Sequence, residues 1–447
     1  MDKPNIIFIL SDQQRHDTMG CYGQKLEVTP NLDNLAKKGV IFTHAFTCQP
    51  VCGPARSCIQ TGLYATETGC FRNGIPLPIS DKNIANYFSN NGYEVGYIGK
   101  WHLASFVNVN IFKRSKKEQY INRGVPLELR GGYKDFWLAS DLLEFTSHGY
   151  DGYLFNENMN KVEFKGYRVD CLTDFVLKYL ETRDEKKPFL LFISYLEPHH
   201  QNDHNQVEGP IGSKEKFKNY QIPGDLEGTQ GDWRENYPDY LGCCNSIDRN
   251  FKRIHNKLEE MGILKNTLII YTSDHGCHFR TRNGEYKRSA HEASIHIPLI
   301  IKGPGFQGGK KISELVSLID LPPTLLTAGG IDVPKHMKGR PLHSLINSTP
   351  KDWSQEVFIQ ISESQVGRAI RTKRWKYSVK APSRRGFYDS GAKEYEEELL
   401  YDLENDIYEK NNLIKDPNYS EIRIKLAKIL KKKMVEAGEE VPIIRSI

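Results

Sequence analysis

Three features are scarce in this sequence, and each scarcity excludes a class of protein. No apolar run among the 447 residues approaches the ~18 consecutive apolar residues of a membrane span, so we expect no membrane partner. The run at residues 6–10 is shorter than the roughly 7–15 apolar residues at the centre of a signal peptide, so we expect a cytoplasmic protein. The formal net charge of +5 is too small for this length to indicate a nucleic-acid partner, and it suits an anionic substrate equally well.

A disulfide framework is not expected either. The nine cysteines are odd in number and scattered along the chain. Without a secretory signal we expect them to be reduced and mostly buried. Cys48, Cys52 and Cys58 could bind zinc, but the CxxC spacing of common zinc sites is absent, so a zinc site remains a minor alternative.

What the sequence does contain is an alternation of strand and helix patterns. A composition of 38% hydrophobic and 26% charged residues is ordinary for a soluble enzyme. Buried strands are expected at residues 5–10, 93–98, 189–195, 267–272 and 298–302, and helices at 30–38, 81–91, 168–182 and 240–261. This alternation predicts the α/β class, with a large doubly wound, mostly parallel sheet flanked by helices over residues 1–350.

Two stretches depart from that alternation. Residues 105–167 are polar, aromatic and rich in glycine, and we expect them to form a long insertion over the functional site. Beyond residue 350 the predicted strands become shorter, at 357–361, 369–379 and 399–403, and a helix is expected at 422–435. Residues 351–447 are therefore predicted to form a smaller C-terminal α+β domain, an antiparallel sheet plus a helix.

One short stretch places a thiol at the start of a helix. Pro54 suits a first helical turn, and Thr61-Gly62 can end the helix. A group at Cys52 would then face the positive end of the helix, with Arg56 about one turn further along the same face. This arrangement is suited to holding an anion.

Chemically active side chains directly follow four of the predicted strands. They lie at residues 11–14, 99–102, 197–200 and 273–276. In an open α/β sheet the binding crevice lies at the carboxyl ends of the strands, so these four groups should converge. Asp12 and Asp274 are the natural oxygen ligands for a divalent cation, with Ca²⁺ the first expectation. Either alone would be expected to be a turn carboxylate.

The stretch from Cys52 to Gly62 closely resembles the Cys-x-Pro-x-Arg and Thr-Gly signature of type I sulfatases, in the alkaline-phosphatase-like superfamily. Residues 401–406 also resemble the C-terminal region of these enzymes. The resemblance implies that a formylglycine-generating maturation enzyme oxidises Cys52 to Cα-formylglycine, whose hydrate is the nucleophile. It implies a sulfatase that hydrolyses a sulfate ester, or a sulfamate, on a carbohydrate or another sulfated small molecule.

The same resemblance assigns roles to the cations at the strand ends. It implies that Arg56 and Lys100 steady the nucleophile, that His199 with Lys287 protonates the leaving group, and that His102 takes the last proton. In this interpretation Arg282, Arg288 and His291 compete with Lys287 for its role.

The resemblance also completes the metal site and suggests substrate contacts. The family usually has an Asp-Asp pair where this chain has Asp12 and Gln13, so the metal should be held less tightly. The resemblance implies that His275 is the fourth ligand. Because imidazole is an unusual ligand for Ca²⁺, the identity of the metal stays open. Contacts with the substrate itself are expected from His200, Arg282 and His291.

Two alternatives remain open from the sequence. The first is a phosphonate or phosphate ester hydrolase of the same superfamily. The second is a non-catalytic binder of sulfated glycans, which the uncharged Gln13 suggests.

Overall fold

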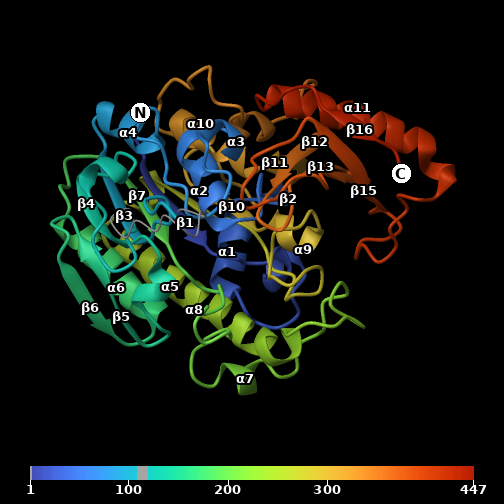
Figure 1. The fold of residues 1–447 in the computed structure, drawn as a ribbon. Helices are drawn as coiled ribbons and strands as arrows, with labels where there is room; N and C mark the ends of the chain where they lie inside the picture. The colour runs from blue at the N-terminus through green and yellow to red at the C-terminus, as the bar shows by residue number, and fades with distance from the viewer. Residues whose placement is uncertain (1–2, 108–118) are drawn as a thin grey trace.

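The computed structural model describes residues 3–107 and 119–447, which contain an 11-stranded sheet and a separate 5-stranded sheet (Figure 1). The large sheet has the order β11-β2-β10-β8-β1-β7-β3-β4-β5-β6, and β9 pairs with β2 outside this path. All neighbouring pairs at its centre are parallel. These central strands are β8 (Thr267–Ser273), β1 (Asn5–Ser11), β7 (Phe189–Ser194), β3 (Glu94–Lys100) and β4 (Phe136–Ser140).

Antiparallel pairs flank this parallel centre. On one side β10 (Leu299–Lys302) runs antiparallel to both β8 and β2 (Val40–Phe46), and β9 (His296–Ile297) also pairs with β2. The edge strand β11 (Lys310–Ser317) returns to a parallel pairing with β2. On the other side a hairpin adds β5 (Asp151–Asn156) and β6 (Lys161–Lys165). The predicted fold class is confirmed, and its parallel part is the centre of the sheet.

Helices cover both faces of the large sheet because its central strand is apolar on both sides. Ile6, Phe8 and Leu10 of β1 belong to one core layer, whereas Ile7 and Ile9 belong to the other. The first layer includes side chains of α2 (Cys52–Thr61), α4 (Ile84–Asn90) and α10 (Leu321–Ala328). The second includes side chains of α1 (Pro30–Lys38), α6 (Arg168–Thr182) and α8 (Trp233–Glu260). Short helices lie in the connections: α3 (Ala65–Thr68), α5 (Leu143–Thr146), α7 (Ser213–Lys216) and α9 (Glu292–Ile295).

The C-terminal part contains the smaller sheet and one long helix (Figure 1). The sheet is formed by β12 (Glu356–Ile361), β13 (Gly367–Thr372), β14 (Trp375–Lys380), β15 (Glu394–Asp402) and β16 (Ile443–Arg445). Its first three pairings are antiparallel and the last is parallel. The helix α11 (Ser420–Glu436) covers it with Leu426, Leu430 and Met434. A domain boundary at residue 350 stays a prediction.

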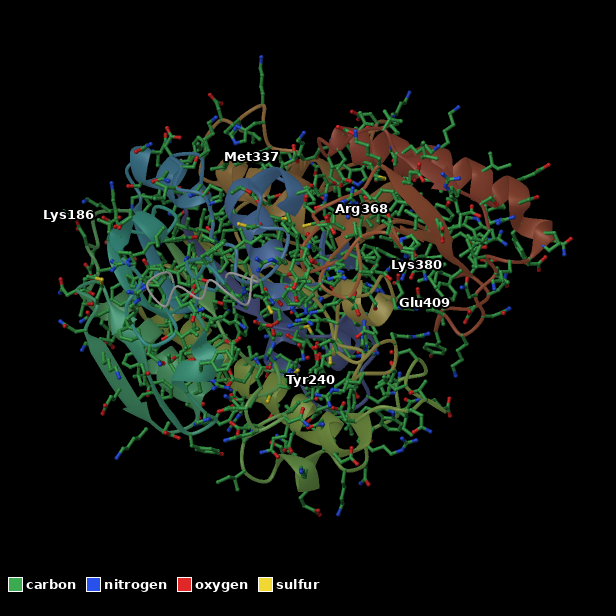
Figure 2. The ribbon with its side chains drawn as sticks, viewed as in Figure 1. Lys186, Tyr240, Met337, Arg368, Lys380 and Glu409 are labelled. Carbon is green, nitrogen blue, oxygen red and sulfur yellow. The ribbon has the colours of Figure 1, made fainter. Side chains whose placement is uncertain are left out.

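The two sheets are joined by buried ion pairs beside α9. Glu409, labelled in Figure 2, lies between the C-terminal sheet and this helix. It accepts a hydrogen bond from the backbone N–H of Glu292 at 2.7 Å and pairs with Lys376 Nζ at 2.5 Å. Lys376 also lies 2.8 Å from the Glu292 carboxylate. The smaller sheet is thereby fixed next to the loop that follows β8.

The prediction that residues 105–167 form a long insertion is wrong, because most of this stretch belongs to the large sheet. Outside residues 108–118, which lie beyond the described part, this stretch supplies β4, β5 and β6 and so extends the large sheet. Strands β5 and β6 were missed because they lie near the sheet edge and bury only a few side chains among polar residues, so they carry no continuous apolar run. Ser105, Val107 and Phe145 nevertheless line the cavity described below.

Several smaller predictions also need correction. The stretch 369–379 was expected to be one strand. It forms parts of two strands, β13 and β14, which are joined by a turn between Thr372 and Trp375. Helix α8 begins seven residues earlier than expected and contains Pro238, which the sequence suggested would precede the helix. Helix α4 begins at Ile84, three residues later than expected. Strands β2 and β11 and helix α10 were not predicted. Among the described residues, no helix is both long enough and apolar enough to cross a membrane.

Candidate active site

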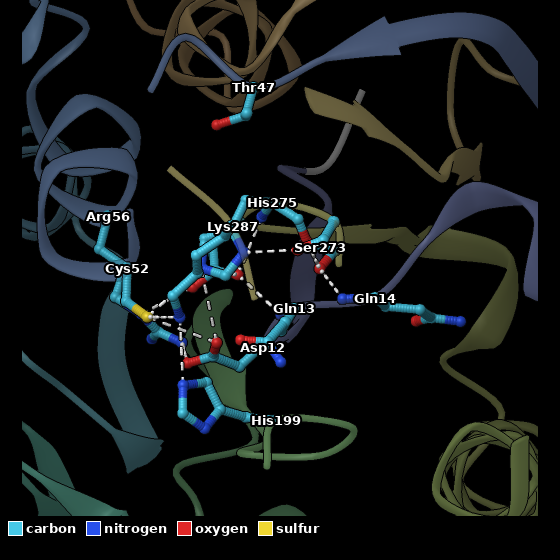
Figure 3. A network of polar contacts seen from close by, with 12 residues as sticks. Asp12, Gln13, Gln14, Thr47, Cys52, Arg56, His199, Ser273, His275 and Lys287 are labelled. Carbon is cyan, nitrogen blue, oxygen red and sulfur yellow. Dashed lines mark hydrogen bonds and ion pairs between the residues drawn. The ribbon is translucent and has the colours of Figure 1, made fainter. Parts of the chain in front are cut away.

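Cys52 is the first residue of α2 and lies in the crevice at the carboxyl ends of the central strands (Figure 3). The helix ends as its sequence indicates, with Gly62 in the left-handed region at φ 70° and its N–H donating to Cys58. At the other end the Gly53 N–H donates to Asn73 Oδ1 at 2.9 Å. A Cβ on Gly53 would lie 3.1 Å from that oxygen, a tight contact that would require the Asn73 side chain to shift by a few tenths of an ångström.

The Cys52 sulfur is surrounded by charged and basic groups. Lys287 Nζ lies 2.9 Å from Sγ, His275 Nε2 lies 3.3 Å from it, and Asp12 Oδ1 lies 3.5 Å from it (Figure 3). Burial alone would raise the pKa of the thiol, but the positive charges of Lys287 and Lys100 outweigh that effect and hold the pKa well below its usual value. The site therefore stabilises a negative group at residue 52.

Asp12 lies between two cations and is completely buried. Its Oδ2 is 2.9 Å from Lys100 Nζ and 3.1 Å from Arg56 Nη2. Burial and the Cys52 thiolate would raise the pKa of Asp12, but Lys100 and Arg56 lower it below its ordinary value. Arg56 is held in turn by its donation to the Lys100 carbonyl at 2.9 Å and to Ser194 Oγ at 2.7 Å.

Two buried oxygen atoms beside Asp12 accept no hydrogen bond from any residue that the structure describes. They are Gln13 Oε1 and Asp274 Oδ2. Arg56 Nε is 3.2 Å from Asp274 Oδ2, but its N–H is not aligned to form a hydrogen bond. Buried oxygens without partners are rare unless an ion or water satisfies them. This donor set therefore fits a divalent cation.

His275 presents a ring nitrogen to the same place. Its Nδ1 lies 3.0 Å from the Gly276 carbonyl and donates to it, so Nε2 is the nitrogen that faces the carboxylates. Nε2 is 3.5 Å from Asp274 Oδ1 and 3.7 Å from Asp12 Oδ1. One ligand atom from each of four residues falls within 4.8 Å of the others: Asp12, Cys52, Asp274 and His275. An imidazole in this set weakens the preference for Ca²⁺ over transition metals.

His199 and Lys287 form a pair above the sulfur. Lys287 Nζ is 3.1 Å from His199 Nε2, and His199 Nδ1 lies 2.6 Å from the His200 carbonyl. Because Nδ1 donates to that carbonyl, Nε2 accepts from the lysine, and the ring is neutral. Burial and the charge of Lys287 lower the pKa of His199, which agrees with that state. Lys287, rather than Arg282, Arg288 or His291, thus occupies the position beside residue 52.

His102 also lines the cavity at Cys52 and is held by an unusual loop. Its backbone is left-handed, at φ 59°, and its Nδ1 is buried without a partner. The Asp141 carboxylate accepts hydrogen bonds from three successive backbone N–H groups after it, at 2.9, 2.9 and 2.8 Å; these belong to Leu103, Ala104 and Ser105. Asp141 therefore fixes the direction in which His102 projects.

Cys52, His102, His199 and Lys287 border a cavity of about 280 Å³. His200 also lines it, with its ring stacked 3.9 Å from the Tyr286 ring between centroids. Burial lowers the pKa of His200, so this ring is neutral. Other lining residues come from distant segments and include Arg72, Glu144, Phe145, Arg288 and Phe387.

Two of the predicted substrate contacts lie elsewhere. Arg282 donates to the carbonyls of Glu409 at 2.9 Å and Tyr408 at 2.8 Å, so its guanidinium holds the C-terminal part. His291 is buried between Ser289 Oγ, at 3.2 Å, and the Tyr401 hydroxyl, at 3.3 Å. Neither residue lines the cavity at Cys52.

Sequence reasoning missed Asp141 and Glu144. Glu144 Oε1 lies 3.2 Å from Lys100 Nζ, opposite Asp12. Both residues directly follow β4, at the same edge of the sheet as the other strand-end groups. The strand-end pattern would have found them if residues 136–140 had been recognised as a strand.

Comparison with known proteins places this geometry in context. The model of the family described as Sulfatase matches residues 4–331, and one described as N-sulphoglucosamine sulphohydrolase, C-terminal, matches residues 284–436. The chain is 29% identical to an ulvan-active sulfatase from Formosa agariphila, over 98% of this chain and 82% of the relative. It is 25% identical to an N-acetylglucosamine-6-O-sulfatase from Bacteroides thetaiotaomicron, over 96% of this chain and 86% of the relative.

A solved structure shares the whole fold. It is a protein in complex with its substrate D-glucosamine-2-N,6-O-disulfate, with a TM-score of 0.78 and 23% sequence identity. The similarity covers 99% of both chains. At this identity the likeness concerns the fold, including the C-terminal sheet.

Proposed function

The chain belongs to the sulfatase family, and we propose from that premise that its substrate is a sulfated saccharide. The protein is a sulfuric ester hydrolase. Support for a saccharide comes from the relative named as an N-acetylglucosamine-6-O-sulfatase and from the neighbour solved with a disulfated glucosamine. The observation that carries the proposal is the cluster of Lys287, His275 and Asp12 around the Cys52 sulfur.

The reaction needs a nucleophile at residue 52 and charge stabilisation around the sulfuryl group. In the proposal Cys52 is matured to formylglycine, and its hydrate supplies that nucleophile. A divalent cation, Ca²⁺ in the first instance, would be held by Asp12, Gln13, Asp274 and His275 and would supply positive charge to the sulfuryl oxygens.

Arg56 and Lys100 contribute fixed positive charge to the same pocket. Both are buried and already positioned, Arg56 by the Lys100 carbonyl and Ser194, and Lys100 by Asp12 and Glu144. Charges held in place before the reaction stabilise a transition state without reorganising.

His199 and Lys287 are suited to move a proton to the leaving oxygen or nitrogen. Lys287 Nζ carries protons next to His199 Nε2, and both side chains border the cavity. His102, which lines the same cavity, would accept the proton released when residue 52 is restored. The neutral His199 tautomer described above is the one that can receive a proton from Lys287 at Nε2.

The test uses protein co-expressed with a formylglycine-generating maturase, with conversion at residue 52 measured by intact mass. The matured enzyme should hydrolyse 4-nitrophenyl sulfate and members of a panel of defined sulfated saccharides, whereas the Cys52→Ala variant should not. The variant should keep its far-ultraviolet circular dichroism and its metal content. Faster turnover of phenyl phosphonate than of 4-nitrophenyl sulfate would instead favour a phosphonate hydrolase, and absence of turnover despite the aldehyde would favour a glycan binder.

A further inference from the structure

The cavity at Cys52 contains a buried cation that the reaction described above does not use. Arg72 is only 5% exposed, and it lines the same cavity as Cys52, His102 and Lys287. Its guanidinium donates to two carbonyl oxygens, those of Asn73 at 2.7 Å and Val107 at 3.1 Å. Within the described residues it forms no ion pair with a carboxylate. Burial lowers the pKa of Arg72 from its usual value, so the charge is held there against a desolvation cost.

Among the described residues, the other lysine and arginine side chains that line the cavity already have partners. Lys287 Nζ lies 2.9 Å from the Cys52 sulfur and 3.1 Å from His199 Nε2. Arg288 lies 3.1 Å from Glu285 and 2.6 Å from Glu363. The carboxylate whose charge acts most strongly on Arg72 is that of Glu363, and both of its oxygens already have partners. One oxygen pairs with Arg288, and the other accepts from the Asn73 N–H at 2.7 Å.

Arg72 is also rigidly tied to the reacting residue. The side chain of its neighbour Asn73 accepts from the Gly53 N–H at the start of α2, one residue after Cys52. On the outer side the guanidinium carbon lies 6.0 Å from the centre of the Phe387 ring, which the C-terminal part contributes. Arg72 is thus positioned between the nucleophile and the outer wall of the cavity, where the remainder of a substrate would lie.

A second arginine shows what a structural role looks like in this fold. Arg130 is 3% exposed and likewise donates to two carbonyls, those of Val125 and Glu157, each at 2.9 Å. Its guanidinium lies over the Trp137 ring, and it does not line the cavity at Cys52. Arg72 differs in that its side chain lines the cavity at Cys52. An arginine has five donors, and a planar anion is its natural partner.

We infer that Arg72 binds a second anionic group of the substrate, a carboxylate or a further sulfate, so that the enzyme acts on a saccharide with at least two negative charges. The inference rests on the proposed sulfatase function and adds the charge of the substrate. The transferred sulfuryl group would occupy the site around Cys52, and the second anion would pair with Arg72 toward Phe387.

The test compares pairs of substrates that differ by one negative charge. The first pair is D-glucosamine-2-N,6-O-disulfate and N-acetylglucosamine 6-sulfate. The second is an unsaturated uronate-containing disaccharide sulfate and the same compound with its carboxyl group reduced to an alcohol. The first pair tests whether the second anion is a sulfate, and the second pair tests whether it is a carboxylate. The readout is the ratio of kcat/KM within each pair, measured for the matured wild type, Arg72→Gln, Arg72→Lys and the matched control Arg130→Gln.

For the wild type we expect one pair to favour the more charged member at least tenfold, mainly through KM, and the preference to weaken with added salt. Arg72→Gln should bring the kcat/KM ratio within about threefold of unity, and Arg72→Lys should keep part of the wild-type preference. Arg130→Gln should leave the ratio at the wild-type value. Turnover of 4-nitrophenyl sulfate reports whether each variant is folded, and the lysine variant gives the ratio if the glutamine variant does not fold.

The inference is overturned if Arg72→Gln lowers kcat/KM by the same factor for both members of the preferred pair. It is also overturned if the wild type prefers the less charged member of each pair. It is also overturned if the wild type hydrolyses 4-nitrophenyl sulfate but no charged member of either pair. Failure to hydrolyse any sulfate would instead remove the proposed function itself.

Discussion

Lys287 Nζ lies 2.9 Å from the sulfur of Cys52 although 235 positions separate the two residues in the sequence. The same ammonium group is 3.1 Å from His199 Nε2. One lysine therefore links the residue that would become the nucleophile with the histidine suited to leaving-group protonation. The loop after β8 delivers the lysine and the helix after β2 delivers the cysteine, so their meeting depends on the whole sheet.

The first prediction concerns this lysine. Lys287→Met should lower kcat/KM for 4-nitrophenyl sulfate by about 10²–10³, because a positioned donor in a buried site is lost. In protein that has not been matured, the pKa of the Cys52 thiol should rise, because Lys287 is the largest of the charges that lower it. Iodoacetamide labelling of residue 52 as a function of pH, followed by mass spectrometry, measures that change. An unchanged labelling profile would contradict the assigned contact.

The second prediction concerns Gln13, which replaces the usual second aspartate. Gln13→Asp should tighten binding of Ca²⁺ by about tenfold, because the unpartnered amide oxygen becomes a charged ligand. The backbone at this position is left-handed, at φ 69°, a conformation that Asp tolerates. Isothermal titration with Ca²⁺ measures the effect. Asp274→Asn serves as the opposite control and should weaken binding.

The third prediction concerns the carboxylate that holds the loop after His102. Asp141→Asn should lower the free energy of unfolding by about 1–3 kcal/mol, because one of the three accepted N–H groups would face an amide NH₂. It should also lower kcat, since His102 loses its fixed direction. Asp135→Asn is the matched control: Asp135 accepts from the Val95 N–H at 2.9 Å, at the far end of β3. This control should cost stability but leave kcat unchanged, as urea unfolding and steady-state kinetics would report.

The fourth prediction concerns pH and His16. Burial, followed by the neighbouring His296, lowers the pKa of His16 from 6.5 to about 3. The unfolded chain therefore binds a proton below about pH 6.5 that the folded chain refuses, so this residue makes stability fall as pH falls from about 6.5 toward 3. At pH 5 the loss is up to about 2 kcal/mol relative to pH 7.

The variant His16→Gln isolates that contribution. Buried carboxyl groups such as Asp248, whose pKa burial raises to about 6, act in the opposite direction, so the total pH dependence is not informative. The difference in unfolding free energy between wild type and His16→Gln should shift by up to about 2 kcal/mol between pH 7 and pH 5. Parallel curves for the two proteins would rule out a half-buried His16 that stays neutral in the folded protein.

Much of the fold could be predicted because local pattern and global position agree. The helices Pro30–Lys38 and Arg168–Thr182 have the predicted bounds, and the apolar run of β1 is buried on both faces as expected. Strands β5 and β6 were missed because strands near a sheet edge bury only one face and so carry no continuous apolar run. The start of α8 was missed because the apolar periodicity used to predict it begins near residue 240, whereas buried contacts of Trp233 and Tyr237 extend the helix to residue 233.

By itself, the sequence determined which chemistry is present. The Cys52 stretch, the strand-end pattern and the two aspartates required only residue identity and spacing, since parallel strands bring their carboxyl ends together wherever they lie in the chain. Only the tertiary structure decided which of several equivalent cations performs which task. Lys287 reaches the sulfur, Arg282 is held by backbone carbonyls of the C-terminal part, and Arg72 pairs with no carboxylate in the part of the chain that the structure describes. The physical reason is that the charge around a buried side chain depends on its neighbours in space, and these come from segments hundreds of residues apart.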